Sequence, residues 1–246
     1  MSGHSKWATI KHAKGAADAK RGQMFTKLIK EISIAARMGG GSVEGNPRLR
    51  TAVLKARAAN MPKDNIERAI KKGTGELEGV TYEELTYEAY APGGVALLIE
   101  VLTDNKNRAA ADVRNILTRA GGQLATAGSV SRLFKRQGTI SLDGEKYTED
   151  QVMEAAIEGG AEDVSLSDGI IEVTTAPEDF EAVVNVLNEK SFETMSAEIS
   201  MVAEADVSLD NDGTAKALKL IDKLEENDDV QNVYSNVSIP DGFESE

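Results

Sequence analysis

The chain has 246 residues and no cysteine; 41% of its residues are hydrophobic, 28% are charged, and its formal net charge is −13. This length allows two or three domains, and the composition is that of a globular protein. The lack of cysteine excludes disulfides, thiolate metal sites and a cysteine nucleophile. Residues 1–72 hold 16 of the 28 Lys and Arg but five of the 41 Asp and Glu, so they carry +11 while the other 174 residues carry −24. A cationic block in an acidic protein indicates a polyanionic partner.

The block begins with an arm, residues 1–17, which has no apolar core of a secretory signal, so we expect a cytoplasmic protein. Cations around a ring that can stack suit a nucleic-acid backbone and an unpaired base. The arm residues predicted to contact nucleic acid are Lys6, Trp7, Lys11 and Lys14. The alternative is that Trp7 packs on the rest of the protein while the lysines are solvated. We expect no metal at His4 and His12, because no cysteine or nearby carboxylate completes a known ligand spacing.

Three helices are predicted to follow the arm as a compact bundle. Apolar spacing predicts the first over 18–38, Asn46-Pro47 predicts the start of the second, and the third covers 62–72. The cations off the apolar stripes are expected to face water or a partner, and those predicted to contact nucleic acid are Lys20, Arg21, Lys27, Lys30, Arg48, Arg50, Lys55, Lys63 and Arg68. The alternative is a basic face that is merely solvated. Solubility alone explains poorly why a segment with a net charge of +11 is joined to one with −24.

From residue 82 the pattern alternates between strands and helices. The first predicted elements are strands at 86–91 and 95–103, a helix that starts within 104–107, and a strand at 128–134. Next comes the order βαββαβ, with strands at 138–142, 163–166, 170–174 and 194–200 and helices at 148–158 and 177–187. That order is the ferredoxin-like plan. A strand at 203–209, a helix at 214–226 and a strand at 230–237 are expected to rejoin the sheet begun at residue 86.

The predicted fold class is therefore α+β multidomain. It comprises an N-terminal helical bundle (1–78), an α/β domain built from two chain segments (79–135 and 201–240), and an inserted ferredoxin-like domain (136–200). RNA-recognition modules share the ferredoxin-like plan and stack bases on aromatic residues of two central strands. The segments 138–142 and 170–174 contain no aromatic residue, which argues against base stacking in this domain.

No motif of a phosphate-binding loop, a zinc protease or a nucleophile elbow occurs, so neither an enzyme nor a cofactor is expected. The polar cluster at 104–108 is the best candidate for a further site, because backbone amides at a helix start can hold a phosphate. Its candidate phosphate-binding residues are Asn105, Asn107 and Arg108. The alternative is a plain helix cap followed by a turn.

Several stretches resemble the YebC/PmpR family: SGHSKWATIKHAKGAADAKRGQMFTKLIKEI, NPRLR, NMPKDNIERAIKKG, YEAYAPGGVALLIEVLTDNKNR and GSVSRLF. The resemblance runs over nearly the whole chain. It implies the same three-domain layout and a cytoplasmic transcriptional regulator that binds DNA and has no enzymatic activity. A mitochondrial relative is similar to a translational activator for cytochrome c oxidase, and other members are linked to stalled ribosomes. The resemblance thus leaves DNA or RNA open as the target.

Three functions remain open at this point. The first is a DNA-binding regulator of transcription, and the second is a translation factor that binds RNA or the ribosome. The third is an acidic interaction module whose basic part docks only on its own acidic body. No membrane partner is expected, and the oligomeric state stays open between a monomer and a weak dimer.

Overall fold

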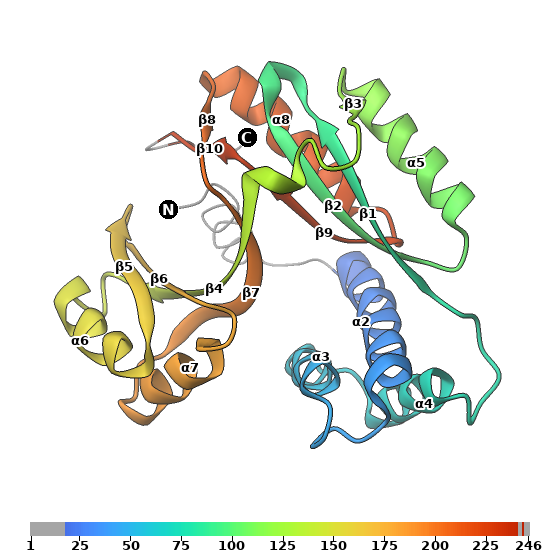
Figure 1. Ribbon diagram of the computed structural model, residues 1–246, viewed down its shortest axis with the longest axis horizontal. Helices are drawn as coiled ribbons and strands as arrows, with labels where there is room; N and C mark the ends of the chain where they lie inside the picture. The colour runs from blue at the N-terminus through green and yellow to red at the C-terminus, as the bar shows by residue number, and fades with distance from the viewer. Residues whose placement is uncertain (1–17, 241–242, 244–246) are drawn as a thin grey trace.

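The structure is a computed structural model that describes residues 18–240 and Phe243, with side chains described from Arg21 onward. The predicted arm therefore lies outside the described residues. Figure 1 shows three groups of elements: helices α2–α4 at the lower right, a sheet with α5 and α8 at the upper right, and a second sheet with α6 and α7 at the lower left. Within the described part of the chain, no helix combines the length and hydropathy that crossing a membrane requires.

The N-terminal bundle consists of α2 (Asp18–Gly39), α3 (Pro47–Ala58) and α4 (Lys63–Thr74). Asn46 fixes the start of α3, because its side-chain oxygen accepts the Leu49 N–H while its amide donates to carbonyls at the end of α2. Gly73 lets α4 approach α2 closely, since a Cβ at this position would lie 2.2 Å from the Ser33 carbonyl oxygen. Ser33 Oγ also donates to Ala69 O at 3.1 Å. The α2–α4 contact is therefore tight and built from small groups.

The first sheet is antiparallel and has the strand order β3-β1-β2-β9. Its elements are β1 (Glu83–Tyr90), the 3₁₀ turn η1 (Pro92–Gly94), β2 (Ala96–Thr103), α5 (Lys106–Arg119), β3 (Gln123–Leu124), α8 (Asn211–Glu225) and β9 (Val230–Ser235). Alternation along β2 divides its side chains: Leu97, Ile99 and Val101 pack toward α5 and α8, whereas Ala96 and Leu98 pack on the opposite face. The pairing of β9 with β2 joins the C-terminal segment to the sheet that β1 begins.

The second sheet has the order β5-β6-β4-β7 and is antiparallel throughout. Its elements are β4 (Phe134–Asp143), α6 (Glu149–Gly159), β5 (Ala161–Ser167), β6 (Ile170–Thr175), α7 (Phe180–Glu189) and β7 (Thr194–Ala203). Side chains from α6 and α7 pack against one face of this sheet around Ile140 and Val173. This chain order and strand order are those of the ferredoxin-like plan. A short parallel pair, β8 (Val207–Ser208) and β10 (Val237–Ser238), follows.

Two predicted strands differ from the structure. The strand expected at 128–134 is wrong: this segment holds turns and the 3₁₀ turn η2 (Ser131–Leu133), and β4 begins only at Phe134. Its N–H groups point at a side chain instead of a neighbouring strand, since the Glu88 carboxylate accepts from Gly128, Val130 and Ser131. The strand expected at 203–209 is interrupted after β7, and only β8 remains of it.

The predicted division into three domains stays a prediction. Strands β4 and β7 run past the limits placed at 135 and 200, because they pair from Phe134 with Ala203 onward. The two sheets also share a small apolar cluster in which Tyr234 of β9 packs with Phe134.

Candidate nucleic-acid interface

The cations predicted to contact nucleic acid fall into three groups. The arm residues lie outside the described part of the chain, and so does the side chain of Lys20. Arg21, Lys63 and Arg68 are exposed, as predicted for a cationic surface. The remaining cations of the bundle are half-buried or contact other parts of the protein, and they are Lys27, Lys30, Arg48, Arg50 and Lys55.

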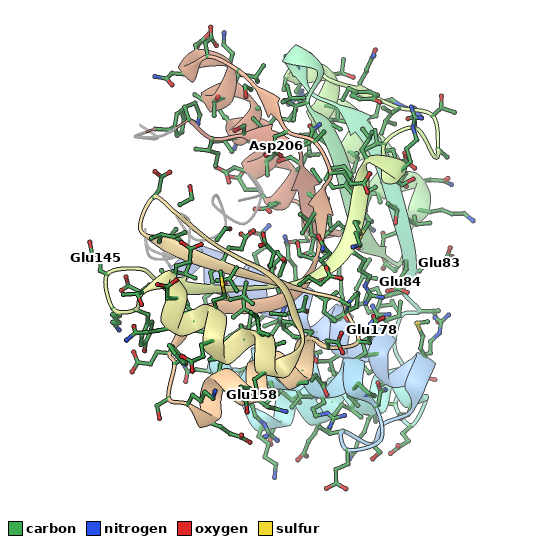
Figure 2. All side chains as sticks on the ribbon, turned by 60° about the vertical axis from the view of Figure 1, so that its left-hand side comes forward. Glu83, Glu84, Glu145, Glu158, Glu178 and Asp206 are labelled. Carbon is green, nitrogen blue, oxygen red and sulfur yellow. The ribbon has the colours of Figure 1, made fainter. Side chains whose placement is uncertain are left out.

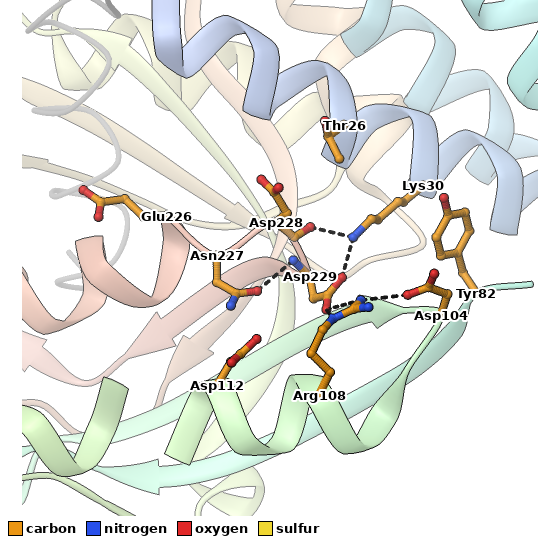
Figure 3. Close-up of a pocket in the computed structure, with 10 residues that line it drawn as sticks. All are labelled: Thr26, Lys30, Tyr82, Asp104, Arg108, Asp112, Glu226, Asn227, Asp228 and Asp229. Carbon is orange, nitrogen blue, oxygen red and sulfur yellow. Dashed lines mark hydrogen bonds and ion pairs between the residues drawn. The ribbon is translucent and has the colours of Figure 1, made fainter. Parts of the chain in front are cut away.

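Lys30 is buried against the body, so the expectation that it faces water or a partner was wrong. Only 7% of the residue is exposed, and its Nζ donates to Asp229 Oδ1 at 2.6 Å and to Asp228 O at 2.8 Å (Figure 3). It also donates to Leu102 O at 3.3 Å. The ammonium also lies 5.7 Å from the centre of the Tyr82 ring. A partner that lies 199 residues away in the chain leaves no trace in the local spacing of apolar residues. Helical periodicity therefore could not separate this lysine from a solvated one.

Two neighbours of Lys30 on α2 contact the end of α8. Lys27 Nζ donates to Glu225 O at 2.6 Å, and Gln23 Nε2 donates to the carbonyls of Glu225 and Glu226. Carbonyls at a helix C-terminus lack intrahelical partners and form the negative end of the helix dipole, so an ammonium is well placed there. Gln23, Lys27 and Lys30 thus form one row along α2 that docks the bundle on the body.

Asp229 is the acidic centre of this docking. Its Oδ2 accepts from Arg108 Nη2 at 2.8 Å and from Thr103 Oγ1 at 3.0 Å, and 6% of its side chain is exposed. Burial alone would raise the pKa of Asp229, but the hydrogen bonds from Lys30 and Arg108 hold that pKa below its ordinary value. We call Gln23, Lys27, Lys30, Asp229 and Arg108 together the clasp.

The polar cluster at 104–108, the candidate phosphate site, forms the start of α5 and contributes Arg108 to the clasp. Asn105 is the N-cap of α5, since its side chain accepts the Arg108 N–H at 3.0 Å. The Arg108 guanidinium bonds to Asp229 and, at 2.7 Å, to Asp104. Asn107 is exposed. The adjacent open cavity, about 460 Å³ in volume, is lined by five carboxylates and two cations (Figure 3): Asp104, Asp112, Glu226, Asp228, Asp229, Lys30 and Arg108. Its excess of carboxylates disfavours a phosphate.

Other cations of the bundle pair with the body at its edges. Arg48 forms a two-pronged ion pair with Glu31, at 2.7 and 3.1 Å, and also contacts Glu84, which raises the pKa of Arg48. Figure 2 shows Glu83 and Glu84 at the start of β1 beside the bundle. Lys55 reaches Glu198 of β7 at 3.4 Å. Arg50 is half-buried, and its Nε has no hydrogen-bond partner within the described residues.

A further set of cations is exposed on the bundle and makes neither an ion pair nor a side-chain hydrogen bond within the described residues. It consists of Arg21, Arg57, Arg68, Lys71 and Lys72. Three of these, Arg57, Lys71 and Lys72, are absent from the contacts predicted from sequence. The signal that could have found Lys71 and Lys72 is their spacing from Arg68, at i+3 and i+4 on one helix. Their position near a helix C-terminus also has a structural explanation, because cations there interact favourably with the helix dipole.

No metal centre is indicated in the part of the chain that the structure describes, where no three His, Asp or Glu side chains gather as ligands for an ion. His4 and His12 lie outside that part.

Comparisons with known proteins match nearly the whole chain. Two family profiles, the TACO1/YebC N-terminal domain and the TACO1/YebC second and third domain, match residues 5–76 and 82–237. A protein of Treponema denticola named a probable transcriptional regulatory protein is 69% identical over 99% of both chains, and one of the same name from Syntrophobacter fumaroxidans is 56% identical over 98% of this chain and 97% of its own. The crystal structure of a conserved hypothetical protein from Aquifex aeolicus, 45% identical, superposes with a TM-score of 0.83 over 93% of this chain and 95% of that one. The chain belongs to the YebC/PmpR family.

Proposed function

We propose that this protein is a non-enzymatic regulator of gene expression that binds DNA through its basic N-terminal arm and helical bundle. In this proposal it acts in the cytoplasm, as a transcriptional regulator. The division into a basic domain (1–78), an α/β domain (79–135 and 201–240) and a ferredoxin-like domain (136–200) belongs to the same proposal. The names of the relatives support a regulatory role.

The observation that carries the proposal is the separation of charge. Residues 1–72 carry +11. The body neutralises part of this charge through Lys27, Lys30, Arg48 and Lys55, yet exposed cations that make no ion pair with any described residue remain on the bundle. A basic domain that served only to dock on its own body would leave no such surplus. The contacts that we retain are Lys6, Trp7, Lys11, Lys14, Lys20, Arg21, Lys63 and Arg68.

Crosslinking in cells, followed by sequencing of both the attached DNA and the attached RNA, tests this function. Enrichment of DNA near promoters supports the proposal. Recovery of RNA alone contradicts transcriptional control through DNA, and recovery of neither polymer contradicts nucleic-acid binding altogether.

The second candidate is a translation factor that binds ribosomal RNA. The observation that favours it is the net charge of −24 on residues 73–246. Ribosomal RNA would repel this acidic body and leave the basic N-terminal part facing the RNA. Sedimentation of a DNase-treated lysate through a sucrose gradient distinguishes the two functions. Co-migration with ribosomes at low salt and release at high salt favours the translation factor, whereas a position at the top of the gradient at both salts favours the DNA-binding regulator.

A further inference from the structure

Two sets of cations on the bundle have different surroundings. One set points at the body and is neutralised by carboxylates: Lys30 is buried against Asp229, and Arg48 pairs with Glu31 and Glu84. The other set lies in the C-terminal half of α4, where Arg68, Lys71 and Lys72 are exposed and make no ion pair within the described residues. No carboxylate within the described residues neutralises the charge of this second set.

These three residues share one face of α4. Positions i, i+3 and i+4 lie next to each other on a helix, with Cβ atoms roughly 5–6 Å apart. The opposite face of α4 is closed, because Ile66 and Ala69 are buried in the bundle core. The other cation of this helix, Lys63, is already paired with Glu67 at 3.4 Å. The free charge of α4 is therefore concentrated at its C-terminal half.

The face is held by a rigid support. Gly73 brings the backbone of α4 against the Ser33 carbonyl of α2, and the Ser33 hydroxyl bonds to Ala69 O. Helix α2 is fixed in turn to the body by the clasp. Cations on such a support do not have to be ordered as a segment when a ligand binds, and the entropic cost of binding is lower.

We infer that Arg68, Lys71 and Lys72 form a contact surface for the phosphodiester backbone of nucleic acid. This inference rests on the proposed function and specifies where on the bundle it is exerted. Guanidinium and ammonium groups bind phosphate oxygens strongly, and such phosphate contacts carry no sequence information. The exposed positions around them offer no set of Asn and Gln for reading base edges. The surface thus binds the backbone with little preference for sequence.

The test compares two full-length variants with the same loss of charge. Arg68→Gln/Lys71→Gln/Lys72→Gln removes the proposed surface, and Lys216→Gln/Lys219→Gln/Lys223→Gln removes three exposed lysines from α8 of the body. Fluorescence anisotropy measures binding to a labelled 20-bp DNA duplex and to a labelled RNA hairpin between 50 and 200 mM salt. Thermal unfolding of both variants reports any structural role of the charges at the end of α4.

For whichever polymer the wild-type chain binds, the α4 variant should bind more weakly and with less dependence on salt. Loss of three phosphate contacts lowers the slope of log K against log salt by about 2.7, so the fall in affinity over this salt range becomes about 40-fold smaller. Lys71→Gln alone should lower the slope by about 0.9. The α8 variant should keep the wild-type slope.

Equal weakening in both triple variants would show an effect of net charge alone and overturn the inference, as would an unchanged slope in the α4 variant. In either of these results the wild-type chain still binds, so the proposed function stands. If the wild-type chain binds neither polymer at 50 mM salt, the proposed function fails together with the surface.

Discussion

Substitution of Asp229 by Asn tests whether the clasp holds the bundle on the body. Asn keeps the size of the side chain but removes the charge that faces Lys30 at 2.6 Å and Arg108 at 2.8 Å. Removing one partner of a buried ion pair typically costs about 3–5 kcal/mol, because the other charge stays buried without compensation. At about 2–4 °C per kcal/mol for a protein of this size, the unfolding temperature should fall by about 6–20 °C.

Thermal unfolding followed by circular dichroism at pH 7 measures this change. The matched control is Asp228→Asn, in the neighbouring residue, whose side chain is exposed and which contacts Lys30 only through its backbone carbonyl. This control should stay within about 0.5 kcal/mol of the wild type. A second substitution, Lys30→Met in the Asp229→Asn background, should recover part of the loss because it removes the uncompensated ammonium.

The reasoning is refuted if Asp229→Asn unfolds at the same temperature as Asp228→Asn. In that case the Lys30–Asp229 pair would contribute no more than an exposed one, and other contacts would dock the bundle. A double substitution that is less stable than Asp229→Asn alone would also contradict the account, since it would show that the unpaired lysine is not the source of the cost.

The remaining predictions concern close packing and buried carboxylates. Gly73→Ala should lower the free energy of unfolding in urea by about 1–3 kcal/mol, because the added Cβ would meet the backbone of α2. The control Gly22→Ala, with open space around its Cβ, should raise that free energy by about 0.4–1 kcal/mol. Equal effects of the two substitutions would contradict close packing at Gly73. Glu88→Gln should cost about 1.5–3 kcal/mol and speed hydrogen exchange at 126–131, and unchanged exchange there would be contrary evidence. Burial raises the pKa values of Glu88 and Asp229, but the hydrogen bonds that each carboxylate accepts lower them further, so both folded pKa values lie below the ordinary ones. The stabilisation from these carboxylates is therefore complete above the unfolded pKa of about 4, and it is lost as the pH falls through the folded pKa values. The unfolding temperature of the wild type should therefore fall as the pH is lowered below about 4, and that of Glu88→Gln should fall less steeply. An equally steep fall in the two proteins would refute this.

Local signals predicted the helices of the bundle well. Asn46 and Pro47 mark the start of α3, and the glycines after residue 38 mark the end of α2, so the predicted ranges lie within two residues of the observed ones. Capping residues and prolines act on backbone groups that are close to them in the sequence, so their effect can be predicted from the local sequence alone.

Features that depend on distant partners were not predicted. Val130 and its neighbours read as a strand, but their N–H groups bond to Glu88, about 40 residues earlier in the chain. Lys30 was predicted to face water or a partner for the same reason, since its actual partner Asp229 belongs to the other end of the chain. Sequence spacing identified the cationic block correctly. It could not tell which of those cations the acidic body already neutralises.

The salt dependence of binding by the intact wild-type chain tests the central claim most directly. If six to ten phosphates are engaged, affinity for a DNA duplex or a structured RNA should fall roughly 10³–10⁵-fold between 50 and 200 mM salt. A binding constant that does not change across this range would contradict a cationic surface on the N-terminal part as the source of the affinity.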